Sequence, residues 1–385
     1  MQNFDYSIPT KIFFGKGQIE KVKYISKLGT RVLMVYGGGS IKKNGVYDDI
    51  VKVFKENEID FVELAGVEPN PRIETVEEGV RLCIENDIDA VLAVGGGSTI
   101  DCAKVIAAAA VYNGPAWDLV LDGSKIRGAL PVATVLTIAA TGSEMDGFAV
   151  ISDMKKNDKL GTGSPYLKPK FSILDPTYTF SVSERQTAAG TADMMSHVFE
   201  VYFTPEKSGY LQARMCEAVL QTAIQYGPVA MKDPENYEAR ANLMWASSLA
   251  INGLLSYGSA VEWSVHNMEH ELSAYYDITH GVGLAILTPY WMEYVLSDET
   301  MYKFVELGKN VWHLNPHQSD EDIAKQAIAK TREFFNELGL PSRLSEVGIG
   351  EEHLAEMAAK LDGQYTDTFV PLTGEQILEI YKMSL

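Results

Sequence analysis

Residues 89–104 read DAVLAVGGGSTIDCAK, an apolar run that passes through three glycines into a helical pattern. This order predicts a strand, a tight turn and a helix, and the backbone amides that open such a helix attract anions. An ordinary turn with Ser98 as the helix N-cap needs only one or two glycines, so the loop favours a phosphate ligand. The spacing is not the GxGxxG pattern, which requires a glycine where Ile100 stands.

The same alternation of short apolar runs and amphipathic segments extends from the N-terminus to about residue 180. It predicts a mostly parallel sheet with helices on both faces, because parallel strands need a crossover connection between them. The other runs that resemble strands are KIFF at 11–14, RVLMVY at 31–36, IDFVEL at 59–64, LPVATVLT at 130–137, GFAVIS at 147–152 and KFSILDP at 170–176.

Beyond residue 180 the apolar spacing is that of helices, and no further strand is predicted. We therefore expect an α/β nucleotide-binding domain over 1–181 and an all-helical metal-binding domain over 182–385, packed over a cleft. Ser183 and Ser319 begin capping boxes, and Asp233-Pro234 predicts another helix start. The predicted helices are 183–203, 208–231, 234–257, 283–296, 320–339, 351–361 and 373–384.

The chain of 385 residues has 33 Lys and Arg against 52 Asp and Glu, a net charge of −19. General attraction to nucleic acid or to an anionic membrane is therefore not expected, and a phosphate must be held by local groups. No signal segment opens the chain and no apolar run is long enough to span a bilayer, so we expect the cytoplasm. Cys83, Cys102 and Cys216 have no metal-binding spacing, and we expect buried thiols in a reducing compartment.

Five candidate metal ligands fall between residues 193 and 280. Asp193 and His197 are four residues apart, as are His266 and His270, and residues at this spacing share one face of a helix. His280 precedes a glycine at a predicted turn. Such a pair more often forms a local hydrogen bond than a metal site, but five candidates in one region favour a site. Spacing alone favours a cage of Asp193, His197, His266 and His270.

Two further loops contain glycine and hydroxyl groups. YGGGSIKK at 36–43 follows a predicted strand, and TIAATGSEMD at 137–146 follows another. Loops at the carboxyl ends of parallel strands lie along one edge of a sheet, where ligands of such folds bind.

Five motifs occur in order: GGGSxxDxxK at 95–104, TGSE at 141–144, LDP at 174–176, DxxxHxxE at 193–200, and HxxxH at 266–270 followed by HGVG at 280–283. Together they resemble the iron-containing alcohol dehydrogenase family, and the resemblance runs from the first strand to about residue 290. YGGGSIKK is most similar to the NADP-dependent butanol dehydrogenase or aldehyde reductase branch. The resemblance implies a Rossmann-like α/β domain before an all-helical domain, the architecture of dehydroquinate synthase.

The resemblance changes the expected metal ligands to Asp193, His197, His266 and His280. His270 then lies near the metal and the nicotinamide, where it would relay a proton or orient groups. Fe(II) is the expected ion, with Zn(II) as the alternative.

The resemblance also implies the cofactor site. Members that use NAD tend to have an acidic residue where Gly38 stands, so NADP is expected here, with Lys42 or Lys43 supplying charge to the 2′-phosphate. The implied contacts are Gly96, Gly97 and Ser98 at the pyrophosphate with Asp101 beside them, Thr137, Thr141 and Lys159 near the nucleotide, and Gly37, Gly38, Gly39, Ser40 and Lys43 at the ribose.

The implied activity is hydride transfer between NADP(H) and small primary alcohols or aldehydes such as butanol and butanal, by a homodimer. A glycerol dehydrogenase or a dehydroquinate-synthase-like enzyme would also bind a metal and a nicotinamide cofactor. A metal-dependent hydrolase would use the same cage to activate water, but it would leave the glycine loops without a ligand.

Overall fold

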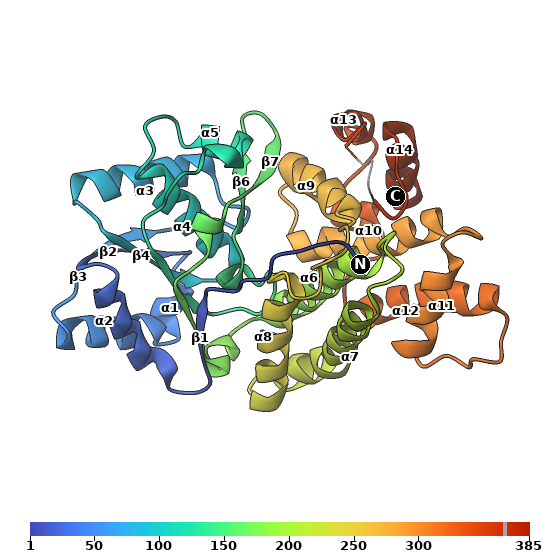
Figure 1. Ribbon diagram of the computed structural model, residues 1–385, viewed down its shortest axis with the longest axis horizontal. Helices are drawn as coiled ribbons and strands as arrows, with labels where there is room; N and C mark the ends of the chain where they lie inside the picture. Colours follow the sequence, from blue (N-terminus) through green and yellow to red (C-terminus); the bar gives the residue numbers. More distant parts are fainter. Residues whose placement is uncertain (365–367) are drawn as a thin grey trace. The chain divides into compact units, whose positions relative to one another are not determined.

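Six parallel strands form the sheet of the N-terminal half (Figure 1). The structure is a computed structural model that describes residues 1–364 and 368–385. The α/β prediction is confirmed, since helical segments connect most of the strands; the connection between residues 136 and 171 also contains a separate hairpin. The strand order is β1 (Lys11–Phe14), β8 (Phe171–Leu174), β5 (Val132–Leu136), β4 (Ala90–Gly95), β2 (Arg31–Tyr36) and β3 (Asp60–Ala65).

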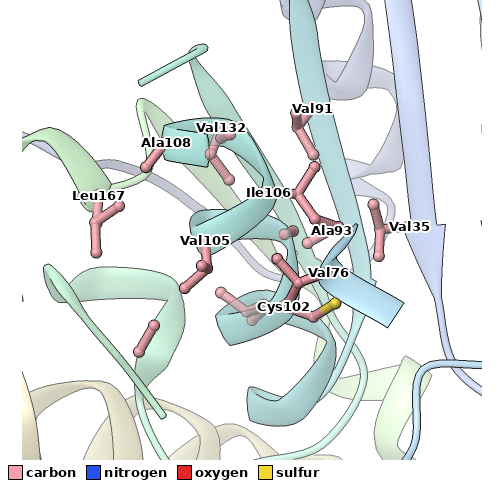
Figure 2. Packing of buried hydrophobic residues seen from close by; sticks show 14 of the residues in the cluster. Val35, Val76, Val91, Ala93, Cys102, Val105, Ile106, Ala108, Val132 and Leu167 are labelled. Carbon is pink, nitrogen blue, oxygen red and sulfur yellow. The ribbon is translucent and has the colours of Figure 1, made fainter. Parts of the chain in front are cut away.

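Alternate residues of the central strands enter two separate cores, because successive side chains of a strand point to opposite faces. Val35 of β2 and Ala93 of β4 pack with α3 (Ile73–Glu85) and α4 (Gly97–Ala109). Figure 2 shows this core, with Ile106 of α4 between the strands and the helices. Met34 and Leu92 belong to the other core, which includes residues of η1 (Gln18–Lys27) and α2 (Val46–Glu56).

One predicted strand is confirmed but lies outside the parallel sheet. GFAVIS lies in β6 (Phe148–Asp153), which pairs antiparallel with β7 (Asp158–Gly163) in a separate hairpin. Sequence reasoning missed β7, because two glycines interrupt its short polar run. The turn is tight, with Asn157 at a φ of 51° and the Lys156 amide donating to the Asp153 carbonyl.

The remaining described elements are mostly helical. Near-complete burial of α6 from Thr187 to Tyr202 makes it the central helix, and it packs against α7 and α10. The Ser183 and Ser319 side chains cap α6 and α12 as predicted. The helices are α6 (Glu184–Tyr202), α7 (Tyr210–Lys232), α8 (Tyr237–Ile251), α9 (Ser264–Tyr276), α10 (His280–Val295), α11 (Met301–Asn310), α12 (Asp320–Glu337), α13 (Leu354–Lys360) and α14 (Gly374–Met383), with short α1 (Ser40–Lys43) and α5 (Trp117–Leu121) earlier in the chain.

Helix α8 is shorter than the predicted 234–257. Asn236, and not Asp233, accepts a hydrogen bond from the Ala239 amide at the start of the helix. Gly253 has a φ of +96°, which ends helical geometry soon after Ile251. Helices α9 and α11 were not among the predicted segments.

Two compact units divide the chain. The sheet unit contains Ser7–Val182 and Pro234–Ser248, and the helical unit contains Met1–Tyr6, Ser183–Asp233 and Leu249–Leu385. The predicted domain division at residue 181 stays a prediction; the compact units differ from it by residues 1–6, 182 and 234–248. Among the described residues, no helix combines the length and apolarity needed to cross a membrane.

The core beneath α4 gives a test of stability. Ile106→Ala should lower the free energy of unfolding by about 2 to 5 kcal/mol, because it removes buried methylene groups and leaves a cavity. Ile84→Ala is the matched control, since Ile84 is 64% exposed on α3. Denaturant titrations would measure the free energy of unfolding of both variants, and equal effects would contradict the burial of Ile106 in the core.

Candidate metal centre and nucleotide loops

Three helices of the helical unit contribute the candidate metal ligands. Asp193 and His197 are on α6, His266 and His270 are on α9, and His280 is the first residue of α10. Asp193, His197 and His266 are each no more than 4% exposed. The side chain of His280 is 22% exposed, which leaves one side of the group accessible.

Asp193, His266 and His280 converge. Each offers one ligand atom, and these atoms all lie within 4.8 Å of one another. His280 Nε2 is 3.7 Å from Asp193 Oδ1, and His197 Nδ1 is 3.4 Å from the same oxygen. The ring centroids of His197 and His266 are 4.5 Å apart. One carboxylate and several imidazoles are donors that suit Fe(II) or Zn(II), so the residues present fit a divalent transition metal.

The electrostatics of His197 also suit a ligand. Burial lowers the pKa of His197 well below its usual value, and His266 beside it lowers the pKa further. The ring is therefore neutral near pH 7, the form in which imidazole binds metals. Among the described residues, the buried His197 Nδ1 forms no hydrogen bond.

His270 belongs to a second group, in which its ligand atom lies within 4.8 Å of those of Glu269 and His280. Its ring centroid is 5.4 Å from that of His280. Spacing alone favoured His270 over His280 for the cage, but the structure places His280 with Asp193 and His266. The sharp turn after α9, where Asp277 has a φ of 51°, returns the chain so that α10 begins beside the ligands.

Two glutamates to which sequence reasoning assigned no role contact the histidines. Glu200 Oε1 lies 3.1 Å from His266 Nδ1, and Glu269 Oε2 contacts His280 Nδ1. Burial raises the pKa of Glu200 to about 8, although backbone amides at the start of α9 oppose the shift. The signal for Glu200 was its position seven residues after Asp193, on the same helical face. Glu269 had no comparable signal, because nothing in the local sequence shows that the chain turns back after α9 and brings His280 to it.

The two glycines of HGVG are explained by packing. A Cβ atom on Gly281 would lie 2.1 Å from the Ala189 carbonyl oxygen of α6, and one on Gly283 would lie 2.7 Å from Glu269 Cγ. Gly281 thus allows α10 to approach α6, and Gly283 leaves room for the glutamate that contacts His280.

In the sheet unit, the glycine loop connects β4 to α4. A Cβ on Gly96 would lie 2.3 Å from Ile138 Cγ2, and one on Gly97 would lie 2.3 Å from Thr141 Oγ1. The loop that follows β5 therefore packs directly on the glycines, and the Thr137 amide donates to the Gly95 carbonyl. Ser98 is in the first turn of α4, where its hydroxyl and the helix amides suit a phosphate.

Asp101 and Lys104, also part of the GGGSxxDxxK motif, bind the protein itself. Asp101 accepts hydrogen bonds from Ser143 Oγ at 2.6 Å and from the Val150 amide at 2.9 Å. Lys104 is fully buried, and its Nζ lies 2.7 Å from Asp146 Oδ1. Burial raises the pKa of Asp101 to about 6. These contacts order residues 143–150. We therefore propose that Asp101 supports the cofactor site by holding these residues in place.

The second glycine loop connects β2 to α1. Gly39 has a φ of +95°, which favours glycine, whereas a Cβ on Gly38 would meet no atom within 4 Å. Lys42 Nζ lies 3.1 Å from Glu63 Oε2. The other predicted contacts are Gly37 and Ser40 on either side of these glycines, exposed Lys43 at the end of α1, and buried Lys159 in the separate hairpin.

Glycine loops at the carboxyl ends of parallel strands and a buried cluster of carboxylate and imidazole ligands define a nucleotide-binding, metal-dependent enzyme. Models of two families match nearly the whole chain. Residues 9–176 match "Iron-containing alcohol dehydrogenase", and residues 187–385 match "Fe-containing alcohol dehydrogenase family, C-terminal". The chain belongs to the iron-containing alcohol dehydrogenase family, as its motifs indicated, and is an oxidoreductase that uses a nicotinamide cofactor.

Relatives extend over the full chain. It is 62% identical over 390 residues to the NADH-dependent butanol dehydrogenase B of Clostridium acetobutylicum, covering 100% of both chains. It is 41% identical over 366 residues to the NADPH-dependent aldehyde reductase YqhD of Escherichia coli, covering 94% of this chain and 93% of that one. The crystal structure of NADH-dependent butanol dehydrogenase A from Thermotoga maritima has a TM-score of 0.95 and 38% identity, covering 100% and 99% of the two chains. All three are named as oxidoreductases, so the hydrolase alternative is not favoured.

Gly281→Ala tests whether helix packing assembles the metal centre. The added methyl group should push α10 away from α6 and separate His280 from Asp193, so purified protein should lose most of its bound metal. Gly128→Ala is the control, because a Cβ there meets no atom within 4 Å and Gly128 has no positive φ. Elemental analysis would measure metal per chain; full occupancy in Gly281→Ala would show that close packing at this point is not required.

Proposed function

We propose that this protein transfers hydride reversibly between NADP(H) and small primary alcohols or aldehydes, such as butanol and butanal, with a bound Fe(II) ion. The observation that carries the proposal is the convergence of Asp193, His266 and His280, with His197 beside them. The names of the relatives, butanol dehydrogenase and aldehyde reductase, support this substrate class. Homodimer formation and a cytoplasmic location stay predictions.

The ligands of the proposed centre are Asp193, His197, His266 and His280. When bound, the cation supplies Lewis-acid polarisation of the substrate oxygen, and the nicotinamide supplies or accepts the hydride. Asp193 and the three imidazoles hold that charge in a buried position, which strengthens its effect on an oxygen atom. His270 lies beside His280 but outside the group with Asp193, so we assign it the transfer or relay of a proton.

The choice between NADPH and NADH depends on the loop after β2. Lys42 is already paired with Glu63, whereas exposed Lys43 forms no ion pair among the described residues. We assign Lys43, with Ser40 and the amides of Gly37 to Gly39, to the 2′-phosphate. No side chain stands at Gly38 to repel that phosphate. The names of the relatives divide on this point, since the clostridial enzyme is named for NADH and the Escherichia coli enzyme for NADPH.

Turnover of butanal with NADPH tests the proposed activity and the roles of the histidines. Absorbance at 340 nm should fall with wild type, whereas Asp193→Ala and His280→Ala should lose both metal and turnover because each removes a ligand. His270→Ala should keep its metal and react more slowly. If His270→Ala lost the ion and His280→Ala retained it, the two assignments would be reversed. If wild-type protein containing metal did not oxidise NADPH with any aldehyde from C2 to C8, the proposed function would be wrong.

Gly38→Asp tests the cofactor assignment. The open space at this position accommodates a side chain, and a carboxylate there should repel a 2′-phosphate and accept from a 2′-hydroxyl. The ratio of kcat/KM for NADPH to that for NADH should fall by about tenfold or more, since tenfold corresponds to about 1.4 kcal/mol, within the range of one charged hydrogen bond. Gly38→Ala, which adds bulk without charge, should leave the ratio near wild type. An unchanged ratio in Gly38→Asp would place the ribose elsewhere.

A further inference from the structure

Two of the proposed histidine ligands each contact a buried glutamate. His266 and His280 each direct Nδ1 at a buried carboxylate, Glu200 for the first and Glu269 for the second. Glu200 is 2% exposed and Glu269 is 0% exposed. A ring that donates its Nδ1 hydrogen to a carboxylate retains the lone pair on Nε2, the nitrogen then available to a metal.

Each carboxylate is itself fixed. Glu200 is on α6, seven residues after Asp193, and its Oε1 also accepts from the His266 backbone amide at 2.9 Å. Glu200 therefore ties the start of α9 to the helix that carries Asp193, and the backbone amides there partly offset the cost that burial imposes on its charge.

Glu269 has a different support. Ser273 Oγ, one turn further along α9, donates to Glu269 Oε1 at 2.5 Å. Gly283, one turn into α10, provides the space for its side chain, because any Cβ there would lie 2.7 Å from Glu269 Cγ. The carboxylate thus connects the orientation of His280 to the packing of α9 on α10.

We propose that Glu200 and Glu269 are positioning residues that fix the ring orientation of His266 and His280 and raise the affinity of the site for a divalent cation. A hydrogen-bonded carboxylate makes the imidazole a better donor and removes the rotational freedom that binding would otherwise cost. His197 has no glutamate at Nδ1, and that atom lies 3.4 Å from Asp193 Oδ1, one turn earlier on α6. The inference rests on the metal centre of the proposed function, but it concerns metal affinity alone.

The ligand-atom distances leave one alternative, in which Glu269 contacts the ion directly, because Glu269, His270 and His280 also form a compact group. The contact between Glu269 Oε2 and His280 Nδ1 favours the positioning role. A carboxylate that accepts from an imidazole N–H is directed at that hydrogen, and His280 Nε2, on the opposite side of the ring, is the atom near Asp193.

The experiment compares Glu269→Gln and Glu200→Gln with wild type in the full-length chain loaded with Zn(II). Competition with a chromophoric chelator, without nicotinamide or alcohol, measures the affinity. Each variant should bind Zn(II) about 10 to 100 times more weakly, the usual cost of losing such a partner. Loading with Co(II) should give an absorption spectrum with the wild-type band positions at saturation, because the set of ligands is unchanged.

The matched control is Glu217→Gln. Glu217 is also a buried glutamate of the helical unit, but its partners are Tyr202, Arg214 and Asn310. This variant should bind Zn(II) as wild type does. The thermal midpoint of each metal-free variant separates a loss of affinity from a loss of folding. Should Glu200→Gln unfold because it loses the contact with α9, Glu269→Gln and Glu269→Ala carry the test.

A folded Glu269→Gln variant that bound Zn(II) with an affinity within twofold of wild type would overturn the inference for Glu269. Shifted Co(II) bands in Glu269→Gln would also overturn it, because they would make Glu269 a direct ligand. Because no substrate is present, failure of the protein to reduce butanal would leave this result unaffected.

Discussion

The close approach of α10 to α6 at Gly281 is the constraint on which the metal centre depends. The Ala189 carbonyl occupies the space that any side chain at Gly281 would need, so these helices are in backbone contact one residue after His280. That contact brings the imidazole of His280, at the start of α10, to the carboxylate of Asp193 in the middle of α6. Glycine at position 281 is therefore needed for this packing, because a Cβ there would lie 2.1 Å from the Ala189 carbonyl oxygen.

Burial makes the same arrangement favourable for a cation. Asp193, Glu200 and Glu269 are at most 3% exposed, and burying three carboxylates close together is costly even when they accept hydrogen bonds. The imidazole of His197 is neutral because its pKa is low. A divalent ion at the convergence of the donors would offset the cost, because it would be the largest local charge and would favour the ionised carboxylates. Binding of the divalent ion and the stability of the helical unit are therefore expected to be coupled.

The sequence predicted more of the fold than of the site. Strands such as RVLMVY were recognisable because buried parallel strands are continuous apolar runs, whereas β7 was missed because its glycines and polar residues give no such pattern. Spacing placed Asp193 and His197 on one face, but it also favoured His270, since nothing local shows that the chain turns back after α9. His280 was one of the five candidates, but only the resemblance favoured it over His270. Glu269 was not found at all, because its role is set by contact between two helices.

Lys104 shows how the sheet unit orders the loop that follows β5. Its ammonium is fully buried and donates to Asp146, to Ser143 and to the Phe148 carbonyl. Ions in solution weaken exposed charge pairs far more than buried ones. The conformation of residues 143–148 should thus be insensitive to ionic strength, so any salt dependence of nucleotide binding would arise at exposed groups such as Lys43.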